Sequence, residues 1–150
     1  MIPGVKKTLS RVKDKLAEKV IRQQVVARIG IYPPKDDSPK EIQRFNNKIT
    51  ALLEMLNNNE PIDIWEYMKD SERKLAKNLA MKYKKYLKYL NADNIMLWLM
   101  YDVPILYGIL IGHPNGRVWL EKTLSKFLDH LIGDEIELKI VDAAEEGNEE

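Results

Sequence analysis

The stretch ERKLAKNLAMKYKKYLKYL, residues 72–90, carries the clearest helical pattern in the chain. On a helical wheel five of its leucines and tyrosines fall within an arc of about 80°, and its basic side chains other than Lys82 fall on the opposite side. The apolar arc consists of Leu75, Leu79, Tyr83, Tyr86 and Leu90. The basic arc consists of Arg73, Lys74, Lys77, Lys84, Lys85 and Lys88. The pattern predicts one helix that buries a Tyr/Leu face and presents a row of positive charges to solvent.

Helical patterns also occupy most of the sequence on either side of this stretch. Ser38-Pro39-Lys40-Glu41 is a capping box with proline at the first helical position, and the asparagines at 57–59 end the helix that follows. Gly133 is a suitable C-terminal cap for the last helix. The expected helices cover residues 5–28, 39–56, 61–68, 72–90, 95–101 with a continuation over 104–111, and 117–132.

These elements predict an all-α protein, built as a single-domain bundle of five or six helices. The length of 150 residues suits one domain and one hydrophobic core. The residues that we expect to be buried are Leu52, Leu56, Leu79, Tyr83, Leu97, Trp98, Ile105, Leu106, Leu120, Leu124 and Leu128.

The C-terminal region departs from the helical pattern. Ile136, Leu138 and Ile140 alternate with charged residues, which allows one short strand over about residues 135–141. Such a strand needs an edge to pair with, either from a second chain or from residues 27–32. The domain organisation that we expect is an N-terminal basic amphipathic helix (1–32), a helical core (33–141) and a disordered acidic tail (142–150).

The net charge of +1 hides a gradient along the chain. Residues 1–50 carry 12 basic and 5 acidic side chains, whereas residues 101–150 carry 4 and 11. This asymmetry indicates either a charged partner or association between copies. The acidic tail is expected to aid solubility or to compete with nucleic acid for the basic helices.

The sequence gives no sign of a membrane or secreted protein. The longest apolar run, Ile95–Ile111, is interrupted by Asp102 and Pro104 and falls short of the roughly 20 residues that a span needs. No signal-peptide pattern opens the chain, and the absence of cysteine fits a reducing compartment. We therefore expect a cytoplasmic protein for which membrane association is disfavoured.

No pattern of catalytic, metal-binding or cofactor-binding residues stands out. The two histidines, His113 and His130, lack metal-site spacing, and the glycines form no phosphate loop. Asp102 lies within an apolar run, where it serves either as a helix cap before Pro104 or as a functional carboxylate; we favour the cap. The sequence therefore predicts a non-enzymatic protein with no cofactor, no metal and no small-molecule substrate.

The basic arc of residues 72–90 is the strongest candidate for a binding surface. Lysines at one-turn spacing suit contacts with a row of phosphates, and such contacts read little sequence. Tyr89 and Met81 flank this arc, where a ring can stack on a base. We therefore predict non-specific binding to DNA or RNA, against the alternative of an ordinary solvated helix face.

A narrow apolar seam marks the N-terminal helix. It consists of Val5, Leu9, Val12, Leu16 and Val20. This helix has three interpretations: it packs on its own bundle, it pairs with a second copy through the seam, or it lies on an anionic membrane or nucleic acid. The second function hypothesis is accordingly a structural or regulatory protein–protein interaction module that forms homo-oligomers through this helix.

Overall fold

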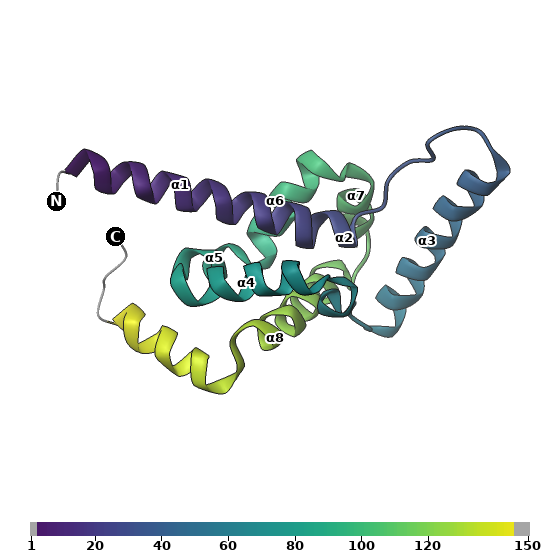
Figure 1. Cartoon of the computed structure of the whole chain (residues 1–150). Coiled ribbons are helices and arrows are strands. Elements are labelled where there is room, and N and C mark those ends of the chain that lie inside the picture. Colours follow the sequence, from purple (N-terminus) through teal and green to yellow (C-terminus); the bar gives the residue numbers. More distant parts are fainter. Residues whose placement is uncertain (1–2, 146–150) are drawn as a thin grey trace.

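The computed structural model describes the backbone of residues 3–145 and the side chains of residues 9–133. Throughout this part of the chain the regular structure is helical, without strands, so the all-α prediction is confirmed (Figure 1). The elements are α1 (Pro3–Ile21), η1 (Arg22–Val26), α2 (Ala27–Ile29), α3 (Pro39–Asn58), η2 (Ile64–Tyr67), α4 (Asp70–Lys82), α5 (Lys84–Tyr89), α6 (Ala92–Asp102), α7 (Pro104–Gly112) and α8 (Gly116–Glu145).

Polar caps at the ends of the helices explain why the chain breaks where it does. The Ser38 hydroxyl accepts a hydrogen bond from the Glu41 amide, and Pro39 occupies the first turn of α3, as the sequence predicts. Asn59 then ends α3 in the left-handed conformation. Asn91 caps α6 by accepting from the Asn94 amide.

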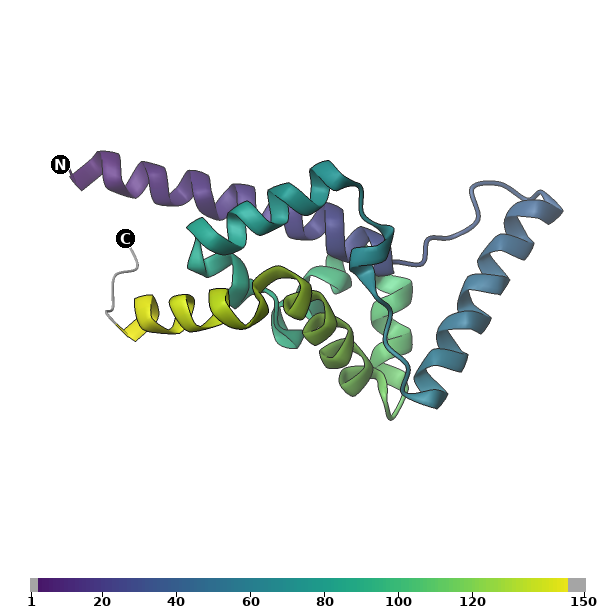
Figure 2. The ribbon, with the colours of Figure 1, turned by 60° about the horizontal axis from the view of Figure 1, so that its bottom comes forward.

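The longest continuous rod in the body joins α1, the π-helical turn η1 and α2 (Figures 1 and 2). Its C-terminal half is buried through Ala17, Ile21, Val25 and Ile29. Its N-terminal half projects beyond the body, on the same side of the molecule as the C-terminal segment of α8. The predicted N-terminal helix is therefore an integral part of the core over half its length.

Helices α4–α8 complete the body and bury its largest side chains. Trp119, Tyr86 and Phe127 are fully buried between them. Of the residues predicted to be buried, Leu97 is exposed because only one face of the apolar α6 packs on the body, and Trp98 and Leu99 occupy that face. Ile105 and Leu128 are half-buried, and the other predicted core residues are buried.

Helix α3 stands away from the body as an arm (Figure 1). At its C-terminal end the Leu56 carbonyl accepts a hydrogen bond from Asn115, and Leu52 and Leu56 are buried. Between the arm and the body lies a mainly apolar pocket of about 580 Å³, lined by Ile29, Ile31, Leu52, Met55, Ile64 and others. The arm is therefore anchored mainly at its C-terminal end, and toward its N-terminal end Phe45 and Ile49 pack against the buried core.

The structure corrects two predictions about secondary structure. The residues around 135–141 are helical, because α8 resumes after a kink at Gly133, whose φ of 53° lies in the left-handed region. A lone strand would leave its backbone groups without partners, whereas a helix satisfies them internally. Four residues of the predicted tail, 142–145, belong to α8, and 146–150 lie outside the described residues.

The second correction concerns residues 72–90, which form two helices. Tyr83 adopts an extended conformation, with φ −141° and ψ 100°, and separates α4 from α5. Its side chain is buried, so the bend keeps the ring in the core.

A partly buried ion pair between Arg28 and Glu72 joins the rod formed by α1, η1 and α2 to α4. The Arg28 guanidinium donates to both carboxylate oxygens of Glu72 and to the Tyr67 carbonyl. These hydrogen bonds, with one from the Lys69 amide, hold the pKa of Glu72 below its ordinary value of 4.5.

We expect Glu72→Gln to lower the melting temperature at pH 7 and to have a smaller effect in acid. A carboxylate with a lowered pKa in the folded state stabilises the fold above its unfolded-state value, near 4.5, and this stabilisation disappears as the pH falls through the folded-state pKa. Thermal denaturation followed by circular dichroism at pH 7 and at about pH 3 measures the difference. Glu66→Gln, at an exposed position six residues earlier in the sequence, is the control; equal effects of the two changes would contradict the assignment.

Candidate nucleic-acid interface

The break at Tyr83 divides the predicted basic row between two neighbourhoods. Arg73, Lys74 and Lys77 lie on α4, whereas Lys84, Lys85 and Lys88 lie on α5. The six residues therefore do not form one straight row along a single helix.

The α4 group is largely engaged in holding η2 in place. Arg73 donates two hydrogen bonds to the Trp65 carbonyl, at 3.0 and 2.8 Å, and lies 3.8 Å from Asp70. Arg73 and Lys77 both contact the Trp65 ring, at 5.6 and 5.5 Å from its centroid. Lys74 is exposed on the same helix. Arg73 thus has a structural role that the sequence pattern does not reveal.

The α5 group lies beside α1, and this packing brings together two basic helices that are distant in sequence (Figures 1 and 2). The Tyr89 hydroxyl donates to Asp14 at 3.2 Å, and the Lys85 ammonium lies 4.0 Å from the same carboxylate. The Lys13 ammonium lies 6.0 Å from the centroid of the Tyr83 ring. Partial burial, and then the negative charge of Asp14, raise the pKa of the Tyr89 hydroxyl, so it stays protonated as a donor.

We define the α1–α5 basic surface as Lys13, Lys84, Lys85 and Lys88. Arg11, Lys15 and Lys19 extend the positive charge along the exposed sides of α1. Two acidic side chains, Asp14 and Glu18, lie on the described part of α1, and both are engaged: Asp14 by α5, and Glu18 by Arg22 at 2.6 Å. Both acids on the described part of α1 are therefore paired within the protein.

The predicted role of Tyr89 in base stacking is not supported by its position. Its ring packs edge-on against Trp98, with centroids 6.1 Å apart, and its hydroxyl contacts Asp14. The ring is half-buried between α1 and α6, and Met81 is the exposed member of the predicted pair. Contacts from this surface to a nucleic acid would therefore be made mainly by ammonium groups.

The predicted oligomer seam divides in the same way. Leu9, Val12 and Leu16 are 51%, 58% and 41% exposed, whereas Val20 is buried in the body. The side chain of Val5 lies outside the described residues. In the described part of the seam, Leu9, Val12 and Leu16 thus form an exposed apolar stripe on α1, and Val20 belongs to the core.

The candidate catalytic and metal-binding residues have structural partners. His130 stacks on Trp65 at 5.4 Å and lies 3.2 Å from Asp63, and His113 forms a hydrogen bond with Asn57 at 2.8 Å. Asp102 is not the cap of α7, because it ends α6 and lies 3.2 Å from Arg22 Nε.

Within the described part of the chain, no group of three or more acidic or histidine side chains is placed to hold a metal ion. None of the described helices combines the length and the apolar character that crossing a membrane requires.

Comparison of the chain with protein-family models, curated proteins and solved structures finds no match.

Proposed function

We propose that this chain is a non-enzymatic accessory protein that binds nucleic acid through the phosphates. The observation that supports the proposal is the packing of α5 against α1, which joins two basic helices into the α1–α5 basic surface. This arrangement modifies the interface expected from sequence: α5 and α1 contribute more than α4, where Arg73 is engaged by Trp65.

The chemistry of the surface favours backbone contacts over sequence reading. Its cations are lysines, which are flexible point charges, and no arginine or asparagine among them offers the paired geometry that distinguishes bases. Each phosphate that a lysine neutralises releases a condensed counterion, so the affinity depends steeply on salt.

We expect the protein to bind duplex and single-stranded DNA and RNA with little sequence preference. If the four lysines each neutralise one phosphate, the slope of log K against log salt is about −3 to −4, and affinity falls about 10²-fold between 50 and 200 mM salt. Fluorescence anisotropy with labelled oligonucleotides of unrelated sequence measures both quantities. Absence of binding at 50 mM salt, or binding that salt does not weaken, would reject the proposal.

A second candidate function is a protein–protein interaction module that uses the projecting half of α1. The exposed stripe of Leu9, Val12 and Leu16 favours it, because adjacent apolar side chains on a projecting helix suit a partner. Lys13, Lys15 and Lys19 surround the stripe, so an acidic partner fits it better than a second copy does. Loss of partner capture by Val12→Glu, with nucleic-acid binding retained, would distinguish this function from the first.

A further inference from the structure

Helix α3 carries a second apolar seam, on the arm that stands away from the body. Ile42, Phe45, Ile49, Leu52 and Leu56 follow the alternating three- and four-residue spacing of coiled-coil a and d positions. The last two of these residues are buried in the body. Toward the other end, Ile42 is 42% exposed, and Phe45 and Ile49 are half-buried. The seam therefore continues from the core onto a part of the arm where it is only partly covered.

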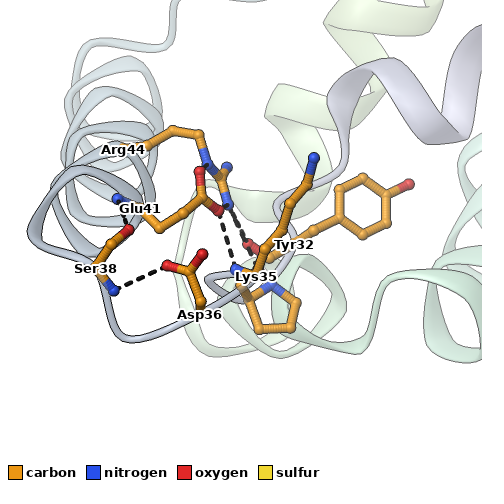
Figure 3. Close-up of polar contacts among 7 residues, drawn as sticks. Tyr32, Lys35, Asp36, Ser38, Glu41 and Arg44 are labelled. Atoms are coloured by element: carbon orange, nitrogen blue, oxygen red, sulfur yellow. Dashed lines mark hydrogen bonds and ion pairs between the residues drawn. The ribbon is translucent and has the colours of Figure 1, made fainter.

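The polar contacts at this end of the arm are made within the arm and its own linker (Figure 3). The Glu41 carboxylate accepts from the Lys35 amide and from Arg44, whose guanidinium also reaches the Tyr32 and Pro33 carbonyls. These contacts fix the linker to the arm. Phe45 and Ile49 pack in part against the buried core, and Ile42 is the exposed member of the seam at this end. The pocket of about 580 Å³ beside Lys48 and Met55 leaves part of this side of the arm uncovered.

We propose that the N-terminal half of α3, residues 39–49, pairs with the same half of α3 in a second copy, in antiparallel orientation. Each arm joins its body at its C-terminal end, so antiparallel pairing places the two bodies at opposite ends of the pair. A register that aligns Ile42 of one copy with Phe45 of the other also brings Lys48 toward Glu41 of the partner copy. Lys48 and Glu41, one heptad apart, thus give the seam a flank that can pair with the same flank of a second copy. The Glu41 carboxylate would then be shared between Arg44 of its own chain and the lysine of the second copy.

Electrostatics favour α3 over α1 as the self-association site. The exposed stripe of α1 is surrounded by lysines, so two copies paired there would bring like charges together. The flanks of the N-terminal half of α3 carry Glu41 and Lys48 on one side and Asn46 on the other, and present no row of like charge. This proposal does not depend on nucleic-acid binding, although a dimer would present two basic surfaces to one polymer.

Sedimentation velocity between about 1 and 100 μM protein tests the pairing. We expect the wild-type mass to rise from one chain toward two, and Ile42→Glu to raise the dissociation constant at least about tenfold. Asn47→Glu adds the same charge on an exposed position of the opposite face and is expected to have little effect. Because Ile42 is partly exposed, its substitution should preserve the helical circular dichroism and the melting temperature, which are checked first.

The geometry has an independent test, since the chain contains no cysteine. A mixture of the Ile42→Cys and Phe45→Cys proteins should form disulfide-linked dimers faster than either protein does alone. A wild-type chain that remains a monomer throughout, or a dimer that Val12→Glu disrupts and Ile42→Glu does not, would overturn the proposal. Faster cross-linking of Ile42→Cys with itself would overturn the antiparallel register.

Discussion

Replacing Lys13, Lys84 and Lys88 together by glutamate is expected to weaken nucleic-acid binding about 10²- to 10³-fold at 50 mM salt. Each replacement removes a phosphate contact and places a negative charge beside the polymer. Since one neutralised phosphate accounts for a salt slope of about 0.9, the slope should become shallower by about 2 to 3. The three residues lie on α1 and α5, which meet only in the folded protein. The loss of affinity therefore tests whether these two helices form one binding surface.

The control is a triple replacement with the same change in net charge at exposed lysines on other helices. Lys40 lies on α3, and Lys122 and Lys126 lie on α8. We expect the control to retain affinity within about threefold, because interactions beyond a Debye length of about 14 Å are largely screened at 50 mM salt. Equal losses in the two triple variants would mean that overall charge drives binding and would remove the assignment to α1 and α5.

A second comparison separates the two halves of the basic row predicted from sequence. Arg73→Gln should lower the free energy of unfolding by more than it reduces the free energy of nucleic-acid binding. The reason is that Arg73 donates to the Trp65 carbonyl and lies over the Trp65 ring. Helical periodicity places Arg73 and Lys88 on one face of an ideal helix. It does not report that Tyr83 interrupts that helix, because the interruption comes from burying the tyrosine ring in the core.

Local signals predicted most helix boundaries correctly because caps act within one turn. The capping box at Ser38 and the terminating Asn59 are examples in which the residue and its hydrogen-bond partner are neighbours in sequence. The alternation of apolar and charged residues at 136–140 is also a local signal, and it gave the wrong prediction. A short run of this kind fits a strand as well as a helix, and the described chain offers no strand edge with which it could pair.

Long-range contacts account for what the sequence did not reveal about the site. The approach of Asp14 to Tyr89 and Lys85 joins residues more than 70 positions apart, and no periodicity encodes it. The charge gradient did indicate that the N-terminal region is basic. The packing of α1 on α5 then determines which of those charges lie next to which lysines of the later helices.

Trp119→Ala is expected to be the most destabilising single core substitution, with a loss of about 3–5 kcal/mol in the free energy of unfolding. Trp119 is fully buried on α8, and its indole N–H donates to the Glu60 carbonyl at 2.8 Å. The substitution therefore leaves a cavity and also removes the partner of a backbone carbonyl in the linker that returns from the arm. For a domain whose total stability is typically about 5–15 kcal/mol, this loss approaches unfolding.

Urea denaturation followed by circular dichroism measures this loss, and Val118→Ala provides the control. The two residues are adjacent in sequence, but Val118 is exposed, so its truncation should change the free energy of unfolding by less than about 0.5 kcal/mol. Trp119→Phe separates the two contributions: it keeps most of the buried ring and lacks the N–H donor, so it should fall between the other variants. Equal costs for Trp119→Ala and Val118→Ala would mean that α8 presents a different face to the core, and with it the linker that positions the α3 arm would be misplaced.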